Sequence, residues 1–203
     1  AFAGVLNPAM SQLHAFVSEY SARDQPWRYL FQTTDVIMGT LLCLAGLATL
    51  VWARHRPLGR QGWSGVGFVA GGFFSVLDAL VTMDCSPTRS QACMAAEEAG
   101  HVSVNHIVHV GTSTIVVVGF ALPILLLNST MTRFRGFGLV VTWAWVVFTL
   151  LNGIGAVGWF VGTPMDYTGI WQRFSLGLGT LWWLILAADD IVTARVQDRA
   201  RSC

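Results

Sequence analysis

The stretch that decides the fold begins Asp-Ala-Leu-Val-Thr-Met-Asp-Cys-Ser-Pro (78–87), continues through a polar segment with a second cysteine, and closes with Ser-Val-Asn-His-Ile-Val-His (103–109). It joins two long apolar runs of a chain in which only 11% of the residues are charged. The stretch nevertheless contains four of the eleven acidic residues and three of the five histidines. Polar chemistry is therefore concentrated here, and any function is to be sought around this turn.

The chain outside this stretch has the composition of an integral membrane protein. It has 203 residues, 54% of them hydrophobic, and a mean hydropathy of +0.57, with several apolar runs long enough to cross a bilayer. A soluble domain would carry roughly twice this density of charge. The twelve basic residues are all arginine and are scattered between the apolar runs, whereas binding to nucleic acid needs a basic face. We therefore predict an all-α, polytopic transmembrane helix bundle that contacts membrane lipid and binds no nucleic acid.

The apolar runs divide the chain into membrane spans within one integral membrane domain, residues 1–203. In the segment 8–34, apolar residues recur with a helical period at Leu13, Phe16, Val17 and Tyr20, which predicts an interfacial segment. Residues 84–103 are expected to form a polar loop. The five predicted spans cover residues 36–53, 63–83, 104–127, 137–161 and 170–192.

The arginines predict the orientation of these spans. Three groups fall on one side of the membrane, and the positive-inside rule makes that side cytoplasmic, together with the C-terminus. The exclusive use of arginine is typical of a GC-rich bacterial genome, so the membrane would be a bacterial plasma membrane. Segment 8–34 then lies outside, which requires a sixth span before Ala1. The arginines of the cytoplasmic groups are Arg54, Arg56, Arg60, Arg133, Arg135, Arg195, Arg199 and Arg201.

Two cysteines lie in the loop that this orientation places outside. Cys85 and Cys93 are separated by a proline and polar residues. A disulfide between them would fit an oxidising, extracytoplasmic compartment. Two free thiols are the alternative, because spacing alone does not establish a bridge.

The ionisable side chains at the outer ends of the spans form a candidate site. Asp78 would lie about 9 Å deeper than Asp84, at 1.5 Å per residue. His106 and His109 share a helix face, as do Asn105 and His109. The acids and histidines expected near the outer surface are Asp35, Asp84, His106, His109 and Asp166.

Three interpretations of this site stay open. A divalent metal such as zinc could be held by His106, His109 and Asp84, because neutral imidazole and carboxylate are metal ligands. A hydrogen-bonded polar cluster could instead lock the helices together, and a metal-free binding pocket is the third interpretation. The cluster members would include Asp35, Asp78, Asn105 and Asn152.

Two functions follow from these interpretations, and the sequence leaves it uncertain whether the chain is an enzyme. The first is an accessory subunit or a lipid- or small-molecule-binding module, which could contact other membrane subunits through glycine-lined helix faces. Gly67 and Gly71 form a small-xxx-small pair of that kind. The second is a metal-dependent hydrolase acting on a lipid or amide at the outer leaflet, with Asp78 or Asp84 as catalytic residue and a bound water as nucleophile.

Short motifs along most of the chain carry a resemblance to a known family. They are Val17-Ser-Glu-Tyr-Ser-Ala22, Gln25-Pro-Trp27, Leu30-Phe31, Asp35, Asp84, His109 and Gly169-Ile-Trp-Gln-Arg173. The chain resembles an uncharacterised six-helix family of bacterial and archaeal integral membrane proteins, domain of unknown function 998. The resemblance implies a membrane-embedded helix bundle and brings no established reaction. The arrangement is more distantly similar to membrane hydrolases of the alkaline-ceramidase type, which use histidines and an aspartate around zinc; their second histidine pair on a late helix has no counterpart here.

Overall fold

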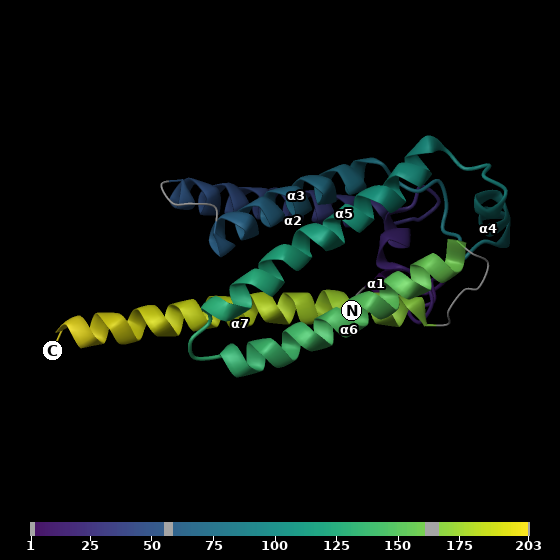
Figure 1. Ribbon diagram of the computed structural model, residues 1–203. Helices are drawn as coiled ribbons and strands as arrows, with labels where there is room; N and C mark the ends of the chain where they lie inside the picture. Colours follow the sequence, from purple (N-terminus) through teal and green to yellow (C-terminus); the bar gives the residue numbers. More distant parts are fainter. Residues whose placement is uncertain (1–2, 55–58, 161–166, 203) are drawn as a thin grey trace.

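The computed structural model describes residues 3–54, 59–160 and 167–202, and these ranges are helical with no strand (Figure 1). The predicted all-α fold is confirmed. Four short elements lie between or before the long helices: α1 (Ala3–Leu6), η1 (Val17–Ser21), α4 (Gln91–Glu98) and η2 (Asn128–Thr130). The long helices are α2 (Arg28–Ala53), α3 (Arg60–Leu80), α5 (Val104–Leu127), α6 (Arg135–Phe160) and α7 (Thr168–Ser202).

Five helices in the described part of the chain are long and apolar enough to cross a membrane. The third span has the predicted bounds, whereas α2 begins eight residues earlier than expected, because nothing between Arg28 and Asp35 breaks a helix. Helix α3 ends at Leu80 rather than at residue 83, and α7 continues ten residues past 192 in a segment rich in good helix formers. Residue 161, the predicted end of the fourth span, lies outside the described ranges. The sixth span stays a prediction.

Helices α2, α3 and α5 pack together through glycines. A Cβ atom added at Gly72 would lie 2.5 Å from the carbonyl oxygen of Gly39, and one added at Gly119 would lie 2.5 Å from the Cα of Gly71. Gly67 and Gly71 therefore do mark a close helix approach. The helix that approaches them is α5 of the same chain, so this glycine face is already covered without another subunit.

Helices α6 and α7 form a second group around Trp182. The side chain of Trp182 is fully buried and belongs to the same apolar core as the buried Trp145 and Ile185. Ile124, near the end of α5, belongs to the same apolar core. The rings of Phe68 and Trp183, 4.7 Å apart, give a further contact between the groups. Large aromatic side chains in this core therefore hold α6 and α7 against the α2, α3 and α5 group.

Within the predicted interfacial segment 8–34, residues 8–27 do not form the helix that their apolar spacing suggested, whereas residues 28–34 belong to α2. The interfacial position stays a prediction. Before α2 the chain forms turns and the short 3-10 helix η1, and the residues of the supposed apolar stripe differ in burial, from Leu13 at 43% exposed to Tyr20 at 0%. The segment is drawn in purple in Figure 1 and lies at the same end of the bundle as α4. Its backbone forms short local turns, and other backbone groups pair with distant parts of the chain, as the next section describes. Helix α4 likewise interrupts the predicted loop 84–103.

Candidate functional site at the disulfide end

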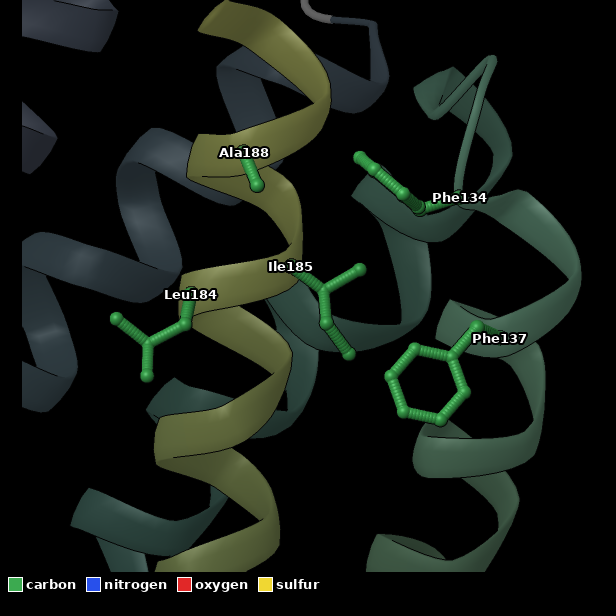
Figure 2. Close-up of a pocket in the computed structure, with 5 residues that line it drawn as sticks. All are labelled: Phe134, Phe137, Leu184, Ile185 and Ala188. Atoms are coloured by element: carbon green, nitrogen blue, oxygen red, sulfur yellow. The ribbon is translucent and has the colours of Figure 1, made fainter. Parts of the chain in front are cut away.

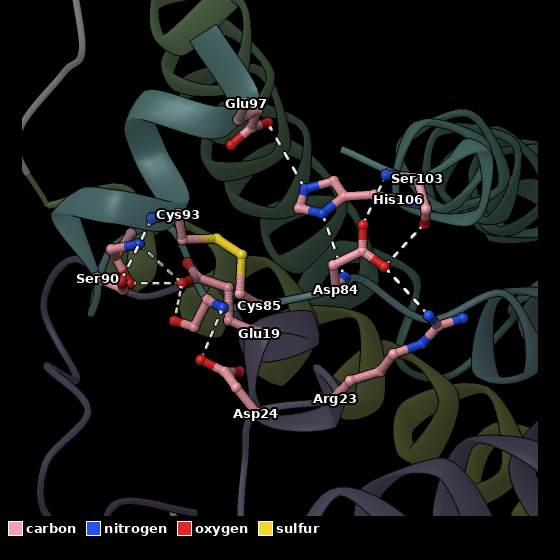
Figure 3. The surroundings of a disulfide bond; sticks show 12 residues. Glu19, Arg23, Asp24, Asp84, Cys85, Ser90, Cys93, Glu97, Ser103 and His106 are labelled. Carbon is pink, nitrogen blue, oxygen red and sulfur yellow. Dashed lines mark hydrogen bonds and ion pairs between the residues drawn. A yellow bond between two sulfur atoms is a disulfide. The ribbon is translucent and has the colours of Figure 1, made fainter. Parts of the chain in front are cut away.

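Cys85 and Cys93 form a disulfide in the connection between α3 and α5 (Figure 3). Their Cα atoms lie 5.9 Å apart. Ser90 caps α4 by accepting a hydrogen bond of 3.3 Å from the backbone N–H of Cys93, so the helix cap and the disulfide fix the same residue. The predicted disulfide is confirmed. We call this part of the bundle, made of residues 7–27, residues 81–103 and the first turn of α7, the disulfide end.

Glu19 is completely buried beside the disulfide. Its carboxylate accepts hydrogen bonds from the hydroxyl of Ser86, from the backbone N–H (3.1 Å) and hydroxyl (2.6 Å) of Thr88, and from the backbone N–H of Phe16 (2.9 Å). Burial raises the pKa of Glu19 above its ordinary value, although these hydrogen bonds act to lower it. Glu19 thereby attaches the N-terminal segment to the disulfide loop.

Residues 14–17 of the N-terminal segment form hydrogen bonds with the start of α7. These bonds join residues more than 150 positions apart, so they hold the N-terminal segment between the two helix groups. Together with the bonds of Glu19, they make this segment the bridge of the disulfide end. The bonds run from the Thr168 hydroxyl to the His14 carbonyl (2.9 Å), from the Arg173 guanidinium to the Ala15 carbonyl (2.8 Å), and from the Val17 N–H to the Gln172 side-chain oxygen (2.5 Å).

Asp84 lies four residues beyond the end of α3, outside the span that was expected to end there. Its carboxylate accepts the backbone N–H (2.6 Å) and hydroxyl (2.8 Å) of Ser103 and pairs with Arg23 at 3.2 Å. Burial acts to raise the pKa of Asp84, but the bonds from Ser103 and the positive charge of Arg23 outweigh it, and the pKa lies below its ordinary value. Asp84 is therefore an ionised anchor for the start of α5.

His106 has no ring nitrogen available to a metal. Its Nδ1 lies 3.2 Å from the backbone N of Asp84, and because that amide can only donate, Nδ1 carries the acceptor lone pair. The neutral ring then has its proton on Nε2, which lies 3.9 Å from Oε1 of Glu97 (Figure 3), too far for a hydrogen bond, so this N–H is buried without a partner among the described residues. His106 is 1% exposed. In this tautomer the ring holds the loop and supplies no ligand atom.

His109 has the opposite tautomer. Its Nδ1 lies 3.1 Å from the carbonyl oxygens of Asp78 and Val81 and 3.2 Å from Oδ1 of Asp78, all of which accept, so Nδ1 must carry the proton. The lone pair is left on Nε2, which is buried without a hydrogen-bond partner among the described residues. Asp78 is fixed in turn by the hydroxyls of Thr112 and Ser113. The structure thus brings Asp78 of α3 and His109 of α5 together.

These bonds bear on the zinc hypothesis. Nowhere in residues 3–54, 59–160 and 167–202 do three His, Cys, Asp or Glu side chains come together as a metal site. His106 and His109 face different partners, and Asp84 is bonded to Ser103 and Arg23. The residues named for zinc therefore do not fit a three-ligand set in this arrangement.

The remaining candidates make no side-chain hydrogen bond to this network among the described residues. Asp35 is seven residues inside α2 with an exposed side chain; its backbone carbonyl accepts a bond from Ser75 (3.5 Å), and its carboxylate is near enough to Asp78 for the two groups to interact electrostatically. Asn105 is half-buried in the first turn of α5, and Oδ1 of Asn152 on α6 is buried without a partner in the described chain. Asn152, placed in the same polar cluster as Asp78 by the sequence, is not bonded to it, because the hydroxyls of Thr112 and Ser113 on α5 bond the Asp78 carboxylate. Asp166 lies outside the described residues.

The family model with the description Protein of unknown function (DUF998) matches residues 1–189, almost the whole chain. The chain belongs to this family. No curated protein and no solved structure matches the chain. The more distant likeness to hydrolases of the alkaline-ceramidase type is not confirmed by these matches.

Glu19, the most heavily bonded acid of the disulfide end, was not recognised as a site residue from the sequence. The motif around Glu19 and the motif ending in Arg173, both of which carried the resemblance to this family, meet in space at the N-terminal segment. The available signal was a lone acid between Val17 and Tyr20 in an otherwise apolar stretch. A carboxylate there needs several donors, and they come from residues 86 and 88.

Proposed function

We propose that this chain is a non-enzymatic membrane module, either an accessory subunit or a protein that binds lipid or a small molecule. The observation that carries the proposal is the use of the polar groups at the disulfide end. Glu19, Asp84 and Nδ1 of His106 are each hydrogen-bonded to other groups of the same chain. Groups committed to internal bonds make a rigid surface for recognition and leave little for chemistry.

The proposed location is the bacterial plasma membrane, with the disulfide end outside and the tail of α7 in the cytoplasm. The arginine distribution and the oxidised cysteine pair both support this orientation. Labelling intact cells with a membrane-impermeant maleimide, in a Cys43→Ser background, tests it through Cys203. We expect Cys203 to react only after the cells are permeabilised, and a tail that reacts in intact cells would overturn the orientation.

Elemental analysis of the purified protein tests the non-enzymatic proposal. We expect no stoichiometric metal in the wild-type protein or in His109→Ala. His14→Ala serves as the matched control, because His14 is exposed at the same end. Zinc that is present at one equivalent, kept in His14→Ala and lost in His109→Ala would contradict the proposal.

A hydrolase acting on a lipid or amide at the outer leaflet is the second candidate, and the Asp78–His109 pair is the observation that favours it. Asp78 accepts from the Nδ1–H of His109, which leaves the lone pair on His109 Nε2 free to accept a proton. This is the arrangement of a general base. The release of fatty acid from a synthetic phospholipid or amide is the test. Hydrolysis that is lost in His109→Gln but kept in His106→Gln would establish this candidate in place of the first.

A further inference from the structure

A shallow apolar groove lies between the start of α6 and α7 (Figure 2), at the end of the bundle opposite α4 (Figure 1). It has a volume of about 210 Å³, less than a pocket that encloses a drug-sized ligand. Its lining is entirely apolar, and two of its side chains are largely exposed, Phe137 at 55% and Leu184 at 63%. The groove therefore suits part of a hydrocarbon chain that enters from the side. The lining residues are Phe134, Phe137, Leu184, Ile185 and Ala188.

Three exposed arginines surround the end of this groove. Arg133 and Arg135 flank Phe134 in the sequence, and Arg195 follows Ala188 by seven residues, which places it on the same face of α7 two turns further on. The described part of the chain contains no ion pair for any of the three. The acids at this end are the buried Asp189, the exposed Asp190, which lies on another face of α7 than Ala188, and the exposed Asp198, three residues after Arg195. With Arg60, which donates to Ser129 of the same end, and Arg199, the arginines outnumber these acids, so the end of the groove keeps a net positive charge.

Asp189 fixes the turn that carries two of these arginines. It is 2% exposed and accepts the backbone N–H groups of Thr132 (2.9 Å), Arg133 (2.6 Å) and Phe134 (2.8 Å). The carboxylate is satisfied by the backbone, so the arginines beside it stay available while their turn is held against α7.

We propose that this groove binds a phospholipid with an anionic headgroup. One acyl chain would lie along the apolar lining, and the phosphate would meet the guanidinium groups of Arg133, Arg135 and Arg195, whose planar donors match phosphate oxygens. A juxtamembrane cluster of arginines attracts anionic lipid, and the adjacent groove adds a place for the chain. The inference deepens the lipid-binding form of the proposed function, on which it rests.

The experiment measures lipid retention by the purified full-length chain in detergent. Phosphatidylglycerol and phosphatidylcholine with identical acyl chains are titrated separately, and bound lipid is counted by native mass spectrometry. Each basic residue near an anionic headgroup is worth about fivefold in affinity, so Arg133→Gln/Arg135→Gln should weaken phosphatidylglycerol binding about 25-fold. Arg28→Gln, at the disulfide end, is the charge control and should leave binding unchanged.

A second pair of variants tests the groove itself. Ala188→Trp fills it, whereas Ala187→Trp places the same side chain on an exposed neighbouring position of α7 that does not line the groove. We expect only Ala188→Trp to reduce retention, and inorganic phosphate alone not to displace the lipid. Equal retention of the two lipids, or equal binding by the two tryptophan variants, would overturn the inference. Neither outcome affects the metal and hydrolysis tests, so failure here is distinct from failure of the proposed function.

Discussion

Gly169 lies directly against the carbonyl oxygen of Ala15, and a Cβ atom at position 169 would stand 2.5 Å from that oxygen. The contact exists because the first turn of α7 pairs with the N-terminal segment. The Ile170 N–H donates to the Leu13 carbonyl at 3.2 Å, next to the bond from the Thr168 hydroxyl. The missing side chain at position 169 therefore allows two backbones to meet at the bridge of the disulfide end.

Gly169→Ala should destabilise the protein. The methyl group would meet a backbone atom, which cannot rotate away, so the first turn of α7 must shift and its bonds to the N-terminal segment lengthen. Overpacking of this kind costs about 1–3 kcal/mol. The measurement is the melting temperature in detergent.

Gly177→Ala is the matched control, because a Cβ atom there would meet nothing within 4 Å and the residue lies in the same helix. Alanine is favoured over glycine in a helix interior, so this variant should be at least as stable as the wild-type protein. A Gly169→Ala protein that melts at the same temperature as Gly177→Ala would show that the close contact does not contribute to the fold.

The spans could be predicted from the sequence because hydropathy and length are local properties. Val104 to Leu127 was placed to the residue, since Ser103 caps that helix and its apolar run is uninterrupted. The N-terminal segment could not be predicted in this way. Its apolar spacing fits a helix, but its backbone forms short turns that are held by bonds to residues such as Thr168, which are far away in the sequence.

The candidate site shows the same division between local and distant information. His106 and His109 were placed on one helix face correctly, yet their roles differ because their partners, the Asp84 N–H and the Asp78 carboxylate, come from another part of the chain. Helical spacing tells which side chains are neighbours. It does not tell which ring nitrogen carries a proton, and that choice separates a metal ligand from a structural hydrogen bond.

Glu19 should make stability depend on pH. Because burial raises its pKa in the folded protein above its ordinary value of 4.5, the folded state binds the proton more tightly than the unfolded chain does. Stability from this group is fully present below pH 4.5 and is lost as pH rises through the folded pKa. Glu19→Gln cannot titrate, so its deficit relative to the wild-type protein should be largest at low pH and should narrow as pH rises.

Melting temperatures measured at several pH values above and below 4.5 test this prediction. Glu98→Gln is the control, because Glu98 is an exposed acid near the same disulfide and its removal should leave the pH profile unchanged. A Glu19→Gln deficit that is constant across this pH range would mean that the buried carboxylate does not titrate there.

Asp78→Asn should leave the stability of the protein nearly unchanged. Asp78→Leu should lower the free energy of unfolding only modestly, because most partners of Asp78 keep another hydrogen bond. Thr112 also reaches the carbonyls of Val108 (3.2 Å) and His109 (2.9 Å), so without Asp78 its hydroxyl keeps a partner. Only Ser113 loses its acceptors outright. We therefore expect Asp78→Leu to cost about 1 kcal/mol, at the low end for an unsatisfied polar group. Melting in detergent would show Asp78→Asn nearer to the wild type, and an asparagine variant as unstable as the leucine one would mean that the charge itself is needed.

The two histidines of α5 should show opposite tautomers. His106 accepts from the Asp84 amide through Nδ1, so its proton belongs on Nε2, whereas His109 faces three oxygens through Nδ1 and must carry its proton there. Nitrogen chemical shifts of protein labelled with ¹⁵N-histidine, recorded in detergent at neutral pH, distinguish the two forms. Signals are assigned by their loss in His106→Gln and His109→Gln.

Asp78→Leu should leave both tautomers in place, because the carbonyls of Asp78 and Val81 belong to the backbone and still require a donor at Nδ1 of His109. Identical tautomers in the two rings would contradict the different roles given to them here, and an Nε2–H form of His109 would remove the basis for considering it as a general base.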